Sequence, residues 1–149
     1  MNKNKICMIF DMDGTLWDAT RGVSEAYNEY LYREKGWKDY LTHQDIISIT
    51  GLEIEEIADR LFPQLDAQER LDITRRCMAY ENEYLSLHGG TLYPKVEETL
   101  AQLAQEHPLM IVTNADDGYV QAMFAAHDIG RYFIDFEMYG RTQLVKGEN

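Results

Sequence analysis

The sequence has few cysteines, few basic residues and no long apolar run. Its two cysteines lack the spacing of a metal site and are typical of free thiols in a reducing compartment. The 14 Lys and Arg against 26 Asp and Glu give a net charge of −12, which argues against binding to nucleic acid or to an anionic membrane. No apolar segment approaches membrane-spanning length, and the N-terminus lacks the apolar region of a signal peptide. We therefore expect a soluble, cytoplasmic protein.

The most informative segment of the sequence is the apolar run of residues 6–10, which is followed by Asp11 and Asp13. Five apolar residues followed by turn residues predict a strand buried on both faces, as in a parallel sheet. In open α/β sheets, ligands bind beyond the carboxyl ends of the strands, so these two carboxylates lie where chemistry usually occurs. Because side chains alternate along a strand, Asp11 and Asp13 can point the same way, and Gly14 lets the backbone approach an anion.

The Asp-x-Asp pair has two interpretations. Carboxylates this close repel each other unless a divalent cation lies between them or one is protonated, and a hard cation such as Mg²⁺ takes oxygen ligands. Asp11 and Asp13 are therefore candidate metal ligands. Toward phosphorus, Asp11 is a candidate nucleophile that would form an aspartyl phosphate, and Asp13 is a candidate general acid and then base. The alternative is that the pair only caps a turn or binds a structural ion.

The run Asp11-Met12-Asp13-Gly14-Thr15-Leu16 resembles the first motif of the haloacid dehalogenase-like phosphatases, and it follows an apolar strand as it does in that family. The resemblance implies an α/β fold with a Rossmann-like parallel sheet, Mg²⁺ as cofactor and a small phosphorylated metabolite as substrate. The motif is similar to that of phosphoglycolate phosphatases and their relatives. A phosphosugar mutase would use the same nucleophile, and the motifs do not separate the two reactions.

Four helical patterns follow one another after this motif. Apolar residues recur at helical spacing within 23–31, 46–49, 54–61 and 71–85. Successive helices without a strand between them do not fit a simple β-α-β order.

The family resemblance places an all-helical cap at this position. We therefore predict a Rossmann-like core of residues 1–17 and 91–149 and a helical cap of residues 18–90. The turn at Thr50 and Gly51, between two of the helices, is a candidate for contacting substrate. Ordinary helix termination explains the same two residues.

A second apolar strand is predicted at residues 108–114, and it again ends in polar residues. It resembles the second motif of the family, a strand that closes with a hydroxyl residue hydrogen-bonded to the phosphoryl group. The resemblance assigns this role to Thr113, and Asn114 follows it as in many members. By itself, a hydroxyl at this position is also a plain helix N-cap.

A third strand fits residues 133–139, and Lys146 follows after a short loop. In the family, a lysine after the third strand neutralises the nucleophile and the phosphate, so the resemblance makes Lys146 a phosphate-binding residue. Arg141 is a second candidate cation. A lysine in a polar tail can also be merely solvated.

The fourth motif of the family, an acidic pair on a further strand that completes the metal site, has no counterpart in the three residues after Lys146. The family core also has two more strands beside the first, so the strand at residues 6–10 would have an unpaired apolar edge, which favours pairing with another chain. We therefore expect an N-terminal piece of a longer protein with impaired activity, or self-association through this edge. A catalytically silent fragment or interaction domain is the alternative to an enzyme.

Overall fold

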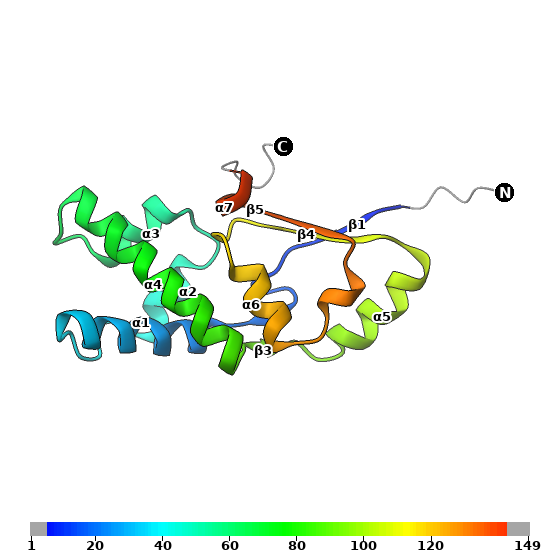
Figure 1. Ribbon diagram of the computed structural model, residues 1–149, viewed down its shortest axis with the longest axis horizontal. Helices are drawn as coiled ribbons and strands as arrows, with labels where there is room; N and C mark the ends of the chain where they lie inside the picture. Colours follow the sequence, from blue (N-terminus) through cyan, green and yellow to red (C-terminus); the bar gives the residue numbers. More distant parts are fainter. Residues whose placement is uncertain (1–5, 143–149) are drawn as a thin grey trace.

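The computed structural model describes residues 6–142 and has an α/β architecture (Figure 1). Its main sheet contains β1 (Met8–Phe10), β4 (Leu109–Thr113) and β5 (Asp135–Met138), which are parallel and lie in the order β1-β4-β5. The predicted α/β class with a parallel sheet is confirmed. Within the described range, no helix is both long enough and apolar enough to cross a bilayer.

One face of this sheet is covered by helices. The strand register aligns Phe10 with Ile111 and Ile111 with Phe136, so these three side chains share a face. The ring of Phe124, on α6 (Tyr119–Ala126), lies edge-on to Phe136 with the ring centroids 5.8 Å apart. Figure 1 shows α6 and α5 (Val96–Glu106) on the same side of the strands.

The opposite face of the first strand is open. Ile9 lies there and is 63% exposed, and Ile6 and Cys7 before the strand are also exposed. The prediction of a strand buried on both faces is therefore wrong, because α5 and α6 both lie on the other side. Within residues 6–142, β1 pairs only with β4. Self-association through its other edge stays a prediction.

Four helices lie between β2 (Trp17–Asp18) and β3 (Thr91–Leu92), and we call residues 20–88 the helical insert. They are α1 (Thr20–Lys35), α2 (His43–Ile49), α3 (Ile54–Leu61) and α4 (Ala67–His88). β2 and β3 pair antiparallel, so the chain enters and leaves the insert through one short ribbon. Two residues per strand are too few for a periodic pattern, and the ribbon was not predicted.

Local signals in the sequence set the ends of the insert helices. The hydroxyl of Thr42 accepts a hydrogen bond from the Asp45 amide, and the Asp45 carboxylate accepts one from the Thr42 amide, which forms a capping box before α2. Asp66 caps α4 by accepting from the amide of Glu69. Gly36 ends α1 with a φ of 71°, a conformation that residues with a Cβ rarely adopt.

The insert is packed onto the core. The long helix α4 packs against α1, α3 and α6, and buried apolar side chains of both parts form one continuous cluster. Two amide side chains also join the parts: Asn82 donates to the carbonyl of Asp117 at 2.9 Å, and Asn114 donates to the carbonyl of Gly51 at 3.3 Å. After α6, a single 3-10 turn, η1 (Gly130–Tyr132), leads to β5, and α7 (Tyr139–Thr142) follows where we predicted the end of a strand and a loop.

Candidate functional site

The first part of the site is the turn that follows β1. Gly14 has a φ of 73°, and its amide donates to the carbonyl of Trp17 at 3.0 Å, which closes the turn directly after Asp13. Met12, between the two aspartates, is 0% exposed, as the alternation of side chains predicts. The hydroxyl of Thr15 donates to Asp11 over 3.5 Å. Both carboxylates therefore lie at the carboxyl end of the sheet, where ligands bind in open α/β folds.

Asp13 is held by two donors from different elements. One of its oxygens, Oδ1, accepts from the Tyr119 hydroxyl at 2.8 Å and from the Trp17 indole nitrogen at 3.1 Å. Burial raises the pKa of Asp13 to about 6, the two hydrogen bonds oppose this rise, and the charge of Asp11 adds to it. A carboxyl group with this pKa can both donate and accept a proton near neutral pH, as a general acid and base must.

A cavity of about 90 Å³ lies between the core and the helical insert. The core contributes Asp13, Thr113 and Asn114 to its lining, and the insert contributes Thr50 and Gly51. The structure thus brings together five of the predicted site residues, which come from three separate segments of the chain. Asp11 belongs to the same strand end, although it does not line the cavity, and Lys146 lies outside the described residues.

The end of β4 contributes a hydroxyl and an amide. Thr113 is 5% exposed, and its hydroxyl oxygen accepts from the amide of Ala115 at 3.2 Å, so it also caps the following turn. Asn114 reaches the Gly51 carbonyl, and this contact holds the turn between α2 and α3 against the strand ends. The roles of Thr113 and Asn114 toward phosphate, and of Thr50 and Gly51 toward substrate, stay predictions.

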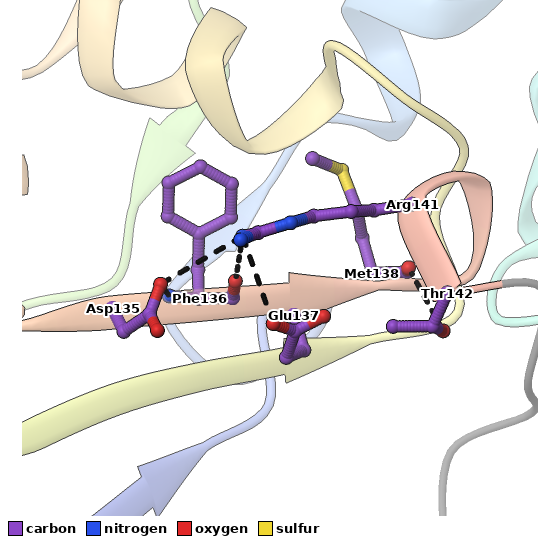
Figure 2. A network of polar contacts seen from close by, with 6 residues as sticks. All are labelled: Asp135, Phe136, Glu137, Met138, Arg141 and Thr142. Atoms are coloured by element: carbon purple, nitrogen blue, oxygen red, sulfur yellow. Dashed lines mark hydrogen bonds and ion pairs between the residues drawn. The ribbon is translucent and has the colours of Figure 1, made fainter.

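Arg141, the second candidate cation, lies along β5 (Figure 2). Its Nη1 donates to the Phe136 carbonyl at 2.8 Å and lies 3.7 Å from Asp135 and 3.6 Å from Glu137. Its guanidinium also lies over the Phe136 ring, 5.7 Å from the centroid. The side chain is thus committed to its own strand, and it does not line the cavity.

Glu81, a carboxyl group in the wall of the cavity, was not predicted as a site residue. Glu81 lies on α4, is 7% exposed and is hydrogen-bonded to Tyr27. Burial, followed by the charge of Asp13, raises its pKa to about 8. The signal was present in the sequence, because Glu81 lies four residues after Cys77 and four before Leu85, both 0% exposed, so a charged residue occupies a core position of the helix.

Tyr119 was also missed as a site residue. It occupies the buried face of α6, where the sequence indicates only packing, and its ring lies edge-on to Trp17 at 5.6 Å. Its hydroxyl meets Asp13 across 106 positions of sequence. No local pattern predicts a contact of that separation.

The carboxylates after β1 fit a hard divalent cation. Among residues 6–142, no three His, Cys, Asp or Glu side chains gather into a metal cage. Mg²⁺, however, is commonly held by one or two carboxylates together with substrate phosphate and water. Asp11 and Asp13 offer only oxygen donors, and a cation would relieve the repulsion that contributes to the raised pKa of Asp13.

Comparison with known proteins shows similarity to one family of hydrolases. Residues 8–145 match the family model described as haloacid dehalogenase-like hydrolase. A phosphoglycolate phosphatase from Photobacterium profundum is 29% identical over 133 residues, which are 85% of this chain and 57% of the relative. A phosphoglycolate phosphatase from Photorhabdus laumondii is 30% identical over 129 residues, which are 83% of this chain and 54% of the relative. The chain therefore spans a little over half the length of these curated relatives.

Solved structures show the same fold. The crystal structure of a predicted phosphoglycolate phosphatase from Haemophilus somnus has a TM-score of 0.75 at 22% identity and covers 95% of this chain and 65% of that one. The crystal structure of the HAD-hydrolase YfnB from Bacillus subtilis bound to magnesium has a TM-score of 0.61 at 17% identity. It covers 95% of this chain and 68% of that one. The elements described above are thus arranged as in these hydrolases.

Proposed function

This chain belongs to the haloacid dehalogenase-like hydrolase family, and we propose that the protein is a phosphatase that hydrolyses a small phosphorylated metabolite. The observation that carries the proposal is the shared cavity, which is lined by Asp13, by the polar end of β4 and by the Thr50-Gly51 turn. In this proposal, residues 18–90 act as a helical cap over a core formed by residues 1–17 and 91–149. The relatives named phosphoglycolate phosphatase support this reaction class.

The reaction proceeds in two displacements at phosphorus. Asp11 attacks phosphorus in line, the bond to the leaving alcohol breaks, and Asp13 gives its proton to the departing oxygen. This leaves an aspartyl phosphate on Asp11. Asp13 then takes a proton from water as the water attacks phosphorus, and the bond to Asp11 breaks to release phosphate. Without a bound metal ion, burial raises the pKa of Asp13 to about 6, close to the pH at which both proton transfers would occur.

The remaining groups hold the phosphoryl oxygens. In this proposal Thr113 and Asn114, at the end of β4, donate to these oxygens, and Lys146 remains the predicted cation. Mg²⁺ held by Asp11 and Asp13 would neutralise the charge of the phosphoryl group when bound. It is also the ion in the YfnB structure.

We further propose that the 149-residue chain hydrolyses esters slowly by itself. It spans 57% and 54% of the two relatives described above, and among residues 6–142 no three His, Cys, Asp or Glu side chains gather around a possible metal site. Hydrolysis of phosphate monoesters needs accelerations of up to about 10²¹, so the absence of any further group that stabilises the transition state should slow turnover strongly.

Release of phosphate from p-nitrophenyl phosphate in the presence of Mg²⁺ tests the proposal. We expect measurable release that is abolished in Asp11→Asn and by EDTA. Asp39→Asn is the matched control, because Asp39 is an exposed residue in the loop between α1 and α2 and Asn tolerates its φ of 47°. Equal release by Asp11→Asn and the unsubstituted chain would contradict the nucleophile, and no release by either would favour the catalytically silent alternative.

A further inference from the structure

The insert side of the cavity is largely apolar. Val23, Ile49, Leu52, Ile57 and Met78 line it, and they come from α1, α2, α4 and the segment around α3. This wall lies opposite the strand ends that are proposed to hold the phosphoryl group. The leaving alcohol of a phosphomonoester would therefore be surrounded by hydrocarbon.

The cavity lining contains acidic side chains and, in the described part of the chain, no basic ones. Asp13, Glu81 and Asp116 line the cavity, and none of its lining side chains in the described part of the chain is a lysine, arginine or histidine. A carboxylate on the leaving alcohol would lose its hydration in an apolar site and lie near these acids, with no cation among the lining residues to compensate.

Glu81 suits an uncharged polar group. It is buried in the wall, where Tyr27 hydrogen bonds to it, and its raised pKa keeps it mainly protonated at neutral pH. A protonated carboxyl group offers one donor and one acceptor to a neutral partner such as a hydroxyl or an amide. A negatively charged partner would instead oppose any ionisation of Glu81.

We propose, on the basis of the phosphatase function proposed above, that the site selects small phosphomonoesters whose alcohol part carries no negative charge. A cavity of about 90 Å³ has room for a group of a few heavy atoms. The two curated relatives are named for phosphoglycolate, and glycolate, the alcohol part of that ester, carries a negatively charged carboxylate. The inference is specific to the residues that line this cavity.

The test compares phosphoglycolate with its amide, which has the same arrangement of heavy atoms and no carboxylate. With the 149-residue chain and Mg²⁺, we expect kcat/KM for the amide to exceed that for phosphoglycolate by about tenfold or more, because like charges in a partly desolvated site repel strongly. Where turnover is slow, calorimetric binding of the two esters to Asp11→Asn gives the same ranking.

Two lysine substitutions separate the effect of a positive charge at the cavity from the effect of the net charge of the protein. Thr50→Lys places a cation on the exposed turn that lines the cavity, and Gln44→Lys adds the same charge on α2 away from it. We expect Thr50→Lys to shift the ratio toward phosphoglycolate by about fivefold or more, since a nearby cation compensates the carboxylate. Gln44→Lys should leave the ratio unchanged.

The outcomes distinguish the two proposals. A preference for the amide that Thr50→Lys reduces supports the inference. Turnover or binding that favours phosphoglycolate overturns it while leaving the phosphatase function in place. If neither ester, nor p-nitrophenyl phosphate, is hydrolysed or bound, the phosphatase proposal fails and the inference fails with it.

Discussion

Replacing Glu81 by Gln tests whether a protonated carboxyl group is built into the wall of the cavity. The side chain is 7% exposed, and its environment consists of Tyr27, apolar groups and the nearby charge of Asp13. Gln has nearly the same shape as a protonated Glu and stays neutral at every pH. The substitution should therefore change stability little at pH values where Glu81 is protonated in both the folded and the unfolded chain, and should stabilise the fold at pH values where the unfolded chain ionises Glu81.

The sign and size follow from the pKa. Burial and then the charge of Asp13 raise the pKa of Glu81 from 4.5 to about 8. Between these pH values the folded state binds more protons than the unfolded state, so the free energy of unfolding falls as the pH rises through this window. The full difference between the two pKa values corresponds to about 5 kcal/mol in the free energy of unfolding. We expect the free energies of unfolding of Glu81→Gln and the unsubstituted chain to differ by roughly 2–5 kcal/mol at high pH. The lower values allow for water that an ionised Glu81 can draw into the adjoining cavity.

Urea unfolding at pH 5, 7 and 9, in EDTA to remove divalent cations, measures this effect. The difference in unfolding free energy between Glu81→Gln and the unsubstituted chain should be small at pH 5 and should grow in favour of the variant toward pH 9. Glu83→Gln is the matched control, because Glu83 is exposed on the same helix. A difference that stays constant with pH, or one that grows equally in Glu83→Gln, would refute the reasoning.

Two further predictions concern the core. Tyr119→Phe removes the hydroxyl that donates to Asp13 at 2.8 Å, so the free energy of unfolding should fall by about 1–2 kcal/mol. The pKa of Asp13 should rise above about 6 because that bond lowers it, and a carboxyl NMR titration with no change would show that the bond does not form. Ile9→Lys should weaken self-association through the edge of β1 in light scattering across concentrations, whereas Ile47→Lys on the insert should not. A strictly monomeric unsubstituted chain would remove this last prediction.

Much of the fold could be predicted because its signals are local. The caps at Thr42 and Asp66 and the glycine that ends α1 are short patterns with a direct physical reason, and they fixed the limits of the insert helices. The exposure of Ile9 could not be predicted in the same way. An apolar run indicates a strand, but the side on which α5 and α6 pack depends on the whole chain.

The candidate site, like the fold, could be predicted only where its signals are local. Asp13 follows β1 and Thr113 is the last residue of β4, and the strand ends of a parallel sheet meet at one edge, so their proximity could be predicted. Glu81 was overlooked because its helix was interpreted through its apolar positions alone. The hydrogen bond from Tyr119 joins elements that are distant in sequence, and only the packing of α6 against the turn after β1 brings them together.

The different roles proposed for Asp11 and Asp13 rest on their surroundings more than on their order in the motif. Asp13 is enclosed by Tyr119 and Trp17, and burial raises its pKa to about 6, so it is suited to exchange a proton and poorly suited to remain an anionic nucleophile. Asp11 belongs to the same strand end but does not line the cavity. Without this burial the pKa of Asp13 would not be raised, and the group would be ionised near neutral pH and unable to donate a proton.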